Sequence, residues 1–81
     1  MDREKTILDY VRDELLEDPD EEISPDTSLF QSRILDSLNL VRLIGFLEET
    51  FNIKINTSEV IIENLDSVRN MLKFLDKKTS P

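Results

Sequence analysis

Cysteine and histidine are both absent from the 81-residue sequence, and glycine occurs only once. Without cysteine the chain forms no disulfide, offers no thiolate nucleophile and provides no thiolate ligand for a metal. Without histidine it lacks the commonest general base and the commonest zinc ligand. These absences argue against a metal site and against catalysis by the chain alone, so we expect that the protein is not an enzyme.

The length allows a single small domain. At this size folding hides roughly 60–65% of the surface that the unfolded chain exposes, which leaves little room for a deep catalytic cleft. Hydrophobic residues make up 38% and charged residues 35% of the chain. This composition is typical of a globular, helix-rich protein. We expect one domain over residues 1–78 and a disordered tail over residues 79–81.

Negative charge is concentrated in the first third of the chain. The net charge is -8, since residues 1–28 hold eleven acidic and three basic side chains, whereas residues 29–81 hold seven of each. Nucleic acids and anionic bilayers attract clustered Lys and Arg, so we expect neither as a partner. No apolar run approaches the ~18–20 residues that cross a bilayer, and the charged N-terminus lacks the apolar segment of a signal peptide. We expect a monomeric, cytoplasmic protein.

The first part of the chain predicts a helix followed by a long loop. Apolar residues recur at helical spacing over residues 2–18, namely Ile7, Leu8, Val11, Leu15 and Leu16. Asp2 suits the helix cap, and Pro19 disfavours helical backbone before it, so the helix should end at Asp18. The polar stretch that follows predicts a loop as far as Asp36. Apolar residues within this loop should anchor it: Ile23, Leu29, Phe30, Ile34 and Leu35.

Asp36 is the expected N-cap of a second helix that runs from Ser37 to Phe51. Its buried stripe should consist of Leu40, Leu43, Ile44, Leu47 and Phe51. Leu38, Val41 and Phe46 lie off that stripe, so the helix has more hydrophobic surface than one core-facing side requires. The alternating apolar residues after it, as far as Ile55, have no second strand to pair with and predict an extended connection.

Two more helices are expected in the rest of the chain. Asn56, with Glu59 three residues later, resembles a capping box and predicts a short third helix over residues 57–62. Asp66 is the expected cap of a fourth helix with a buried stripe of Val68, Met71, Leu72 and Leu75, and Lys77 and Lys78 complement its C-terminal dipole. The predicted fold is all-α: a small up-and-down four-helix bundle with three longer helices, a short third helix and a long loop between helices one and two.

Ser37 directly follows a cap residue and therefore lies in the first turn of a helix. A phosphate ester at this hydroxyl would face free backbone N–H groups and the positive end of the helix dipole, both of which stabilise an anion. Taken alone, the Asp36-Ser37 pair is more simply explained by ordinary capping. We do not expect Ser37 to act as a nucleophile, because no histidine is present to accept its proton.

Four segments of the sequence together form a specific pattern. They are Ile23-Ser24-Pro25-Asp26-Thr27-Ser28-Leu29-Phe30, Ile34-Leu35-Asp36-Ser37-Leu38, Leu47-Glu48-Glu49-Thr50-Phe51-Asn52-Ile53-Lys54-Ile55 and Asn64-Leu65-Asp66-Ser67-Val68. In this order and spacing they resemble the acyl carrier and peptidyl carrier proteins over nearly the whole chain. The resemblance implies a single carrier domain with an acyl-carrier-protein-like fold.

The resemblance also implies that Ser37 is esterified to 4'-phosphopantetheine, which a separate phosphopantetheinyl transferase takes from coenzyme A. The thiol of this arm would hold acyl or aminoacyl groups as thioesters for the enzymes that load, condense or transfer them. Asp36 would help the transferase and its magnesium to engage Ser37. The partner-facing residues would be Leu38, Val41, Arg42, Glu48 and Glu49. Simpler structural explanations remain open: a cap for Asp36, a solvated face for the two glutamates and a core position for Leu38.

Some positions depart from the pattern that the resemblance implies. Arg33 stands where glycine is frequent, so the turn there is expected to differ. Asn39 and Arg42 stand where acids are common, which should weaken steering toward basic partners. Phe46 is bulky where carriers that shelter long acyl chains have small residues. We therefore expect a specialised biosynthetic pathway for acyl or aminoacyl units rather than housekeeping fatty-acid synthesis.

Two alternatives belong to other classes of protein. A helical protein–protein interaction module without a prosthetic group would use the exposed apolar side of the second helix. An EF-hand calcium site is suggested by the acidic run from Asp18 to Glu22, but the glycine that its sharp turn needs is missing. The interaction module therefore remains the main alternative to a carrier.

Overall fold

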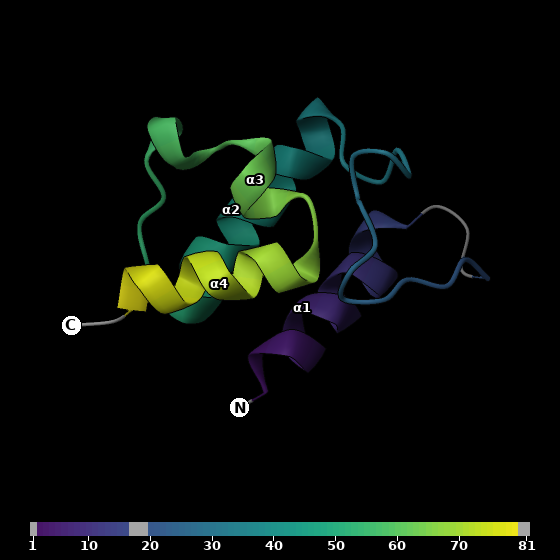
Figure 1. Ribbon diagram of the computed structural model, residues 1–81, viewed down its shortest axis with the longest axis horizontal. Helices are drawn as coiled ribbons and strands as arrows, with labels where there is room; N and C mark the ends of the chain where they lie inside the picture. Colours follow the sequence, from purple (N-terminus) through teal and green to yellow (C-terminus); the bar gives the residue numbers. More distant parts are fainter. Residues whose placement is uncertain (1, 17–19, 80–81) are drawn as a thin grey trace.

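The computed structural model describes residues 2–16 and 20–79, and within these ranges every regular element is helical. Helix α1 (Arg3–Tyr10) continues into a π-helical turn, η1 (Val11–Leu15), and α2 (Ser37–Phe51) follows the long loop (Figure 1). A short 3-10 turn, η2 (Thr57–Glu59), precedes α3 (Ile62–Leu65) and α4 (Val68–Thr79). The structure confirms the predicted small all-α bundle with a long loop between its first and second helices.

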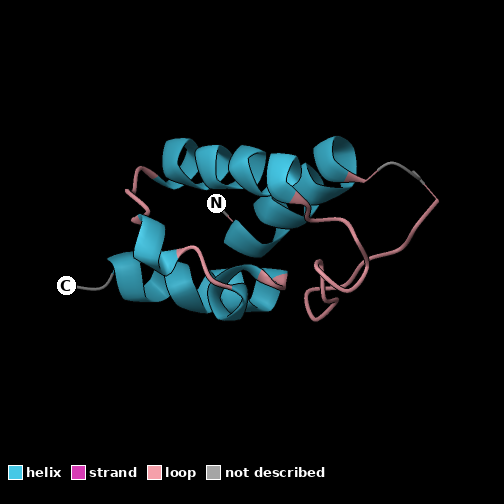
Figure 2. Ribbon diagram, turned by 90° about the horizontal axis from the view of Figure 1, so that it is seen from above, coloured by secondary structure: helices cyan, strands magenta, loops and turns pink. Residues whose placement is uncertain are grey.

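The helices form two layers with the core between them. Figure 2 shows the N-terminal end of α1 between these layers and the long loop at the end of the molecule opposite the C-terminus. Every α-helix contributes to the buried core, which consists of Ile7, Val11, Leu15, Leu29, Ile34, Leu35, Leu43, Leu47, Ile55, Leu65, Val68, Met71, Phe74 and Leu75. Full burial of such a side chain contributes about 1.5–3 kcal/mol, so packing of these few residues dominates the stability of so small a domain.

The predicted bounds of α2 are confirmed at both ends. The backbone of Asp36 is extended, and its carboxylate accepts a hydrogen bond from the N–H of Asn39 at 2.8 Å. At the other end Asn52 adopts the left-handed conformation, with φ at 54°, and the N–H of Ile53 donates to the carbonyl of Glu48 at 3.2 Å. These contacts satisfy backbone groups that a helix end leaves free. The predicted stripe faces the core, with Leu43 and Leu47 buried and Leu40, Ile44 and Phe51 partly buried.

Phe46 does not lie apart from the core as its position in the helix suggested. Its ring stacks on Tyr10 with centroids 3.9 Å apart, and it meets the edge of Phe51 at 6.3 Å. The Tyr10 hydroxyl donates to the carbonyl of Arg42 at 3.2 Å. These ring contacts connect α1 and α2 and explain how a bulky residue is accommodated at position 46.

The long loop is anchored by the apolar residues that the sequence suggested. Three of them, Leu29, Ile34 and Leu35, are buried, and Ile23 and Phe30 are partly buried against the core. The loop therefore adds side chains to the core, although many of its other residues are exposed. It also ends at a fixed place, because its last apolar residues immediately precede Asp36.

Polar contacts fasten the same loop to the corner between α3 and α4. The N–H of Leu29 donates to the carbonyl of Asp66 at 2.6 Å, and the hydroxyl of Ser28 donates to the Asp66 carboxylate at 2.7 Å. Arg69 of α4 forms an ion pair with Asp26, and its hydrogen bond is the main cause that lowers the pKa of that carboxyl below its ordinary value. A loop of this length is thus held at several points along its course.

The prediction that Asp66 caps the fourth helix is wrong. Helix α4 begins at Val68, and the hydroxyl oxygen of Ser67 accepts a hydrogen bond from the N–H of Asn70 at 3.1 Å, as an N-cap does. Asp66 instead follows the last residue of α3, and its carboxylate accepts hydrogen bonds from the loop. Asp66 and Ser67 are both residue types that suit an N-cap. Because the Asp66 carboxylate bonds to the distant loop, Ser67 is the residue that caps α4.

The predicted third helix over residues 57–62 is also wrong in its extent. The capping box is present, since Asn56 and Glu59 bond to each other's backbone, but it opens only the 3-10 turn η2. Val60 has φ -83° and ψ 76°, outside the helical region, and α3 begins two residues later. The run of β-branched residues at 60–62 is a poor helix former and accounts for the break. A salt bridge from Lys78 to Glu59, at 2.8 Å, lowers the pKa of this glutamate and ties η2 to α4.

The ends of the first and last helices also differ from their predicted positions. Asp2 caps α1 as expected, with its carboxylate 3.2 Å from the N–H of Lys5. Helical backbone stops at Leu15 because Leu16 is extended, and the predicted end at Asp18 falls outside the described residues. Thr79, which we predicted to begin a disordered tail, is the last residue of α4, and residues 80–81 are not described.

Candidate functional site

Ser37 is an exposed residue at the first position of α2. The preceding Asp36 holds the start of the helix, because its carboxylate bonds to Asn39 and its carbonyl accepts from Leu40 at 2.8 Å. The N–H groups of the first helical residues have no partner within a helix, and the helix dipole is positive here. A phosphodiester on the Ser37 oxygen would therefore lie beside favourable charge and open solvent.

A tight turn delivers Ser37 to this position. The N–H groups of Ile34 and Leu35 both donate to the carbonyl of Leu29, at 2.9 and 3.1 Å. Arg33, in the middle of this turn, has a φ of 61°. This is the left-handed region that glycine occupies at least cost. The turn thus has a left-handed residue where glycine was expected from the resemblance, and Arg33 tolerates that conformation.

The side chain of Asn39 joins this turn to the helix. Its amide nitrogen donates to the carbonyl of Ile34 at 2.8 Å, while its backbone N–H bonds to Asp36. Asn39 therefore fixes both residues that flank the approach to Ser37. Sequence reasoning identified Asn39 only as a departure from an acidic pattern and missed this positioning role.

The outer side of α2 next to Ser37 is apolar. Leu38 and Val41 are 68% and 67% exposed, so Leu38 is not the core residue that one explanation suggested. Arg42 is exposed and pairs with Glu14 at 3.4 Å. Glu49 is exposed near the end of the helix. Of the predicted partner-facing residues, Leu38 and Val41 lie within about one turn of Ser37, whereas Glu49 lies about three turns away.

Glu48 has an internal structural role. It is half-buried, and its carboxylate accepts a hydrogen bond from the N–H of Ile55 at 2.9 Å. The structure therefore does not place this glutamate with the apolar surface around Ser37. Two further exposed hydrophobic residues that we had not singled out, Ile61 and Ile62, lie at the start of α3 and are 45% and 60% exposed. Their β-branched run beyond the capping box was the available signal.

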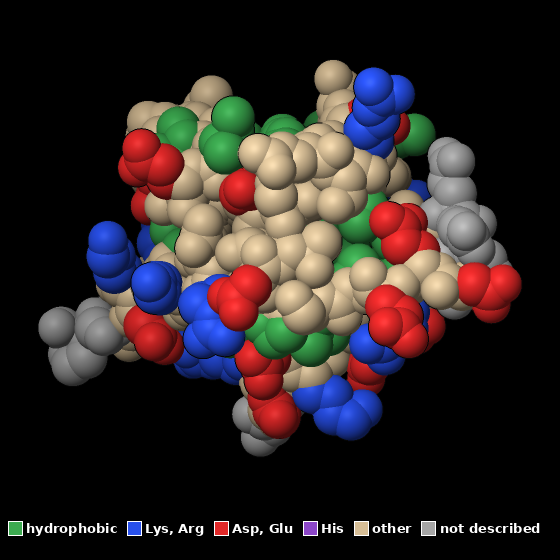
Figure 3. Space-filling view, turned by 45° about the vertical axis from the view of Figure 1, so that its right-hand side comes forward, with side chains coloured by type: hydrophobic (Ala, Val, Ile, Leu, Met, Phe, Trp, Pro, Cys, Tyr) green, Lys and Arg blue, Asp and Glu red, His purple; other side chains and the backbone are tan. Residues whose placement is uncertain are grey.

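Charge is unevenly distributed around this site. The described acidic residues of η1 and the start of the loop, which are Asp13, Glu14, Asp20, Glu21 and Glu22, are all exposed. Figure 3 shows several acidic side chains close together at the right of the molecule, and hydrophobic side chains that reach this face in separate patches. The first half of α2 carries no acidic side chain.

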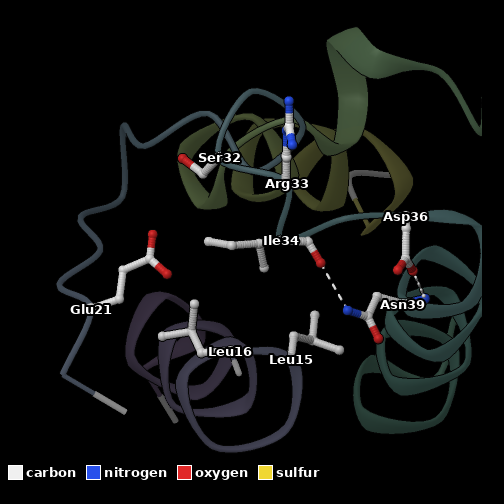
Figure 4. A pocket seen from close by; sticks show the side chains of 8 residues that line it. All are labelled: Leu15, Leu16, Glu21, Ser32, Arg33, Ile34, Asp36 and Asn39. Carbon is white, nitrogen blue, oxygen red and sulfur yellow. Dashed lines mark hydrogen bonds between the residues drawn. The ribbon is translucent and has the colours of Figure 1, made fainter. Parts of the chain in front are cut away.

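A cavity of about 240 Å³ lies between η1, the loop and the start of α2. Leu15, Leu16 and Ile34 point into it from opposite sides, and Glu21 directs its carboxylate inward (Figure 4). Ser32, Arg33, Asp36 and Asn39 complete its lining, and Figure 4 shows the Arg33 side chain directed away from the other lining residues. The cavity is partly open to solvent and its lining is more polar than apolar, and Asp36, the chain neighbour of Ser37, is part of that lining.

Comparison with known proteins identifies the family. Residues 5–75 match the family described as "Phosphopantetheine attachment site". The chain belongs to this family of carrier proteins. It is also 34% identical over 77 residues to the D-alanyl carrier proteins of Streptococcus pyogenes serotype M5 (strain Manfredo) and serotype M1, and each alignment covers 95% of both chains.

Family membership confirms the resemblance and gives the cofactor of this carrier protein as covalently bound 4'-phosphopantetheine. It also implies that the carrier interacts with a phosphopantetheinyl transferase and with biosynthetic enzymes. The exposed hydroxyl of Ser37, at the positive end of a 15-residue helix, fits the phosphate of this group. Among the described residues of the carrier, no helix is long and apolar enough to cross a membrane.

Proposed function

We propose that the Ser37 oxygen is the attachment point of the 4'-phosphopantetheine arm. The observation that carries this proposal is that Ser37 is exposed and also occupies the first position of a long helix. None of the other described serines is an exposed residue at the first position of a long helix. Ser67 is buried and caps α4, and Ser28 donates a hydrogen bond to Asp66. Ser24 bonds to Thr27, Ser32 lies in the loop, and Ser58 lies in a short 3-10 turn. Ser37 is thus the described serine best placed to receive a phosphodiester.

Attachment forms a bond between the Ser37 oxygen and the β-phosphorus of coenzyme A. The bond from that phosphorus to the oxygen bridging the two phosphates breaks, and adenosine 3',5'-bisphosphate leaves. The transferase must supply the base that takes the hydroxyl proton, because the carrier has no histidine and its nearest carboxylate, Asp36, already bonds to the backbone of Asn39. Asp36 would orient Ser37 and offer its remaining oxygen to the magnesium of the transferase.

In this proposal the carrier performs no chemistry of its own. The arm, once attached, supplies the thiol on which cargo is held as a thioester. Leu38 and Val41 would contact the partner enzymes, because they are exposed and next to Ser37. Glu49 and Arg42 would contribute at the edge, although Arg42 first has to part from Glu14. The side of α2 that contacts partners would be more apolar than that of a carrier with an acidic second helix. Binding of partners would therefore depend less on charge and be less sensitive to salt.

We further propose that the cargo is a small aminoacyl unit, and a D-alanyl group is the first candidate. Two observations support this: the similarity to D-alanyl carrier proteins, and the stack of the bulky Phe46 ring on Tyr10, which packs α2 against α1. A bulky, packed side chain at this position leaves less room beside it for a long acyl chain than a small residue would. The pathway would be specialised rather than housekeeping fatty-acid synthesis.

The attachment site is tested by intact-mass measurement after incubation with coenzyme A, magnesium and a broad-specificity phosphopantetheinyl transferase. We expect the wild-type chain to gain one arm and Ser37→Ala to gain none. Ser32→Ala is the matched control, because Ser32 is also exposed and lies in the loop before α2; it should be modified like the wild type. An arm on Ser37→Ala would contradict the assignment, and an unmodified wild type would favour the interaction module.

The cargo is tested by offering the modified carrier to a D-alanine-activating ligase with ATP, and separately to a fatty-acyl ligase with long-chain substrates. We expect a thioester of D-alanine to form at least about tenfold more efficiently than a long-chain thioester, as judged by intact mass over time. Efficient long-chain loading with little D-alanylation would overturn the cargo proposal and leave the attachment site unaffected.

A further inference from the structure

Arg33 is held in a backbone conformation that a residue with a side chain disfavours. Its φ of 61° lies in the left-handed region, where a Cβ comes close to a neighbouring carbonyl oxygen and glycine is accommodated at least cost. The turn fixes this conformation, because the N–H of Arg33 donates to the carbonyl of Phe30 at 3.1 Å and the next two residues bond to Leu29. Glycine would form the same turn without this cost. Strain of this kind is a reason to look for a function of the side chain.

The charge of Arg33 has no partner in the part of the chain that the structure describes. The other four arginines each form an ion pair with a carboxylate: Arg3 with Asp76, Arg12 with Asp9, Arg42 with Glu14 and Arg69 with Asp26. The Arg33 side chain is exposed and forms neither an ion pair nor a hydrogen bond with any described residue. Figure 4 shows it directed away from Glu21 and Asp36, the two acids that line the cavity with it. Its guanidinium is therefore free to bind a group outside the chain.

Arg33 lies within the area that an enzyme bound around Ser37 would cover. The two residues are four positions apart, so their Cα atoms are no more than about 15 Å from each other. A standard interface covers roughly 800 Å² of each partner, which corresponds to a disc about 16 Å in radius. An enzyme that takes the arm from Ser37 into its active site would therefore cover Arg33 as well.

We propose that Arg33 is a recognition residue for the enzyme that loads cargo onto the arm, and that its guanidinium pairs with a carboxylate of that enzyme. This inference rests on the proposed attachment at Ser37. A guanidinium binds a carboxylate through two parallel hydrogen bonds, so the pair fixes the orientation of the two proteins in addition to attracting them. The strained turn presents the guanidinium from a fixed backbone position.

The loading enzyme is the partner that has to distinguish this carrier from others. A transferase with broad specificity modifies carriers that have different residues at this position, whereas the loading enzyme decides which cargo this carrier receives. Loading should therefore depend on Arg33, and attachment of the arm should not. Because the two steps are measured separately, a failure of this proposal is distinguishable from a failure of attachment at Ser37.

The test measures loading of the modified carrier by its loading enzyme, purified from the cells that make the carrier by following thioester formation on the wild-type chain. For Arg33→Gly we expect the KM for the carrier to rise about tenfold with little change in kcat. The midpoint of its urea unfolding should not fall, because glycine suits the turn. Arg33→Lys should recover part of the loss, and Arg33→Glu should lose more than Arg33→Gly. The KM of the wild type should rise with salt more steeply than that of Arg33→Gly.

Asn52→Gly is the matched control, because Asn52 is the other described residue with a left-handed backbone and lies at the opposite end of α2. This variant should be loaded like the wild type. An unchanged KM for Arg33→Gly, or an equal increase for Asn52→Gly, would overturn the proposal. Intact mass should show one arm on every variant before loading. A wild-type chain that never gains an arm would overturn the attachment site and this proposal together.

Discussion

Gly45 is an exposed residue in the middle of α2 that the fold does not require to be glycine. A side chain added there would meet no atom within 4 Å, and its backbone is not in the left-handed region. Glycine inside a helix is less favourable than alanine by about 1 kcal/mol. No internal contact offsets this cost. Without a side chain at position 45, a partner protein could approach the backbone of α2 closely on the side of the helix that includes Ser37.

Gly45→Ala should therefore stabilise the protein. We expect the free energy of unfolding to rise by about 0.5–1 kcal/mol, because helix propensity improves and nothing clashes. Urea unfolding measures this change in the free energy of unfolding, and the slope of the free energy against urea concentration should stay the same. Lys73→Ala, at an exposed position of α4 that already holds a good helix former, should change stability by less than about 0.5 kcal/mol. Equal or lower stability of the Gly45 variant would show that the fold does constrain this position.

The local sequence pattern was sufficient for Ser37 and insufficient for its surroundings. A cap residue followed by a helical apolar repeat places an exposed hydroxyl at a helix start, and this depends only on neighbouring residues. The left-handed backbone of Arg33 and the bond from Asn39 to Ile34 depend on how the loop folds back on itself. Such contacts leave no signature in the spacing of residue types.

At the scale of elements, the predictions held where both ends of a helix carry strong local signals. The bounds of α2 follow from the cap at Asp36 and the left-handed Asn52. The predictions failed at two places. The capping box at Asn56 favours a helix, whereas the β-branched run at 60–62 disfavours one, and only a short 3-10 turn forms. Asp66 and Ser67 both suit the cap of α4, and the contact of Asp66 with the loop leaves Ser67 as the cap. The cavity could not be predicted, because it forms between η1 and a loop segment more than fifteen residues away.

The attachment of the long loop to the α3–α4 corner gives a prediction at this scale. Asp66→Ala removes the acceptor for the Ser28 hydroxyl and for the N–H of Phe30, which is 3.3 Å from the carboxylate. Leaving these partly buried donors unpaired should lower the free energy of unfolding by about 1–3 kcal/mol. Urea unfolding measures the change.

Asp76→Ala is the matched control for this loss. Asp76 is exposed and forms only a surface ion pair with Arg3 at 3.3 Å, so its removal should cost less than about 1 kcal/mol. In a double-mutant cycle, Ser28→Ala and Asp66→Ala should couple by about 0.5 kcal/mol or more. Additive effects, or equal losses from both aspartate variants, would contradict the proposed fastening of the loop.

At the scale of the whole molecule, the radius of gyration of 11.8 Å is close to the roughly 12 Å expected for a folded domain of 81 residues. The molecule as a whole is therefore compact, with the long loop at one end of its longest axis. A domain this small, with no histidine or cysteine, has few means of catalysis and is well suited to hold a tethered group at an exposed point.

The central claim is that the arm is attached through the oxygen of Ser37. Tandem mass spectrometry of the modified wild-type chain tests it most directly, because fragmentation locates the phosphopantetheine within the sequence. We predict that every fragment bearing the arm contains Ser37 and that fragments ending before Asp36 or beginning at Leu38 have their unmodified masses. An arm located on any other residue would contradict the account.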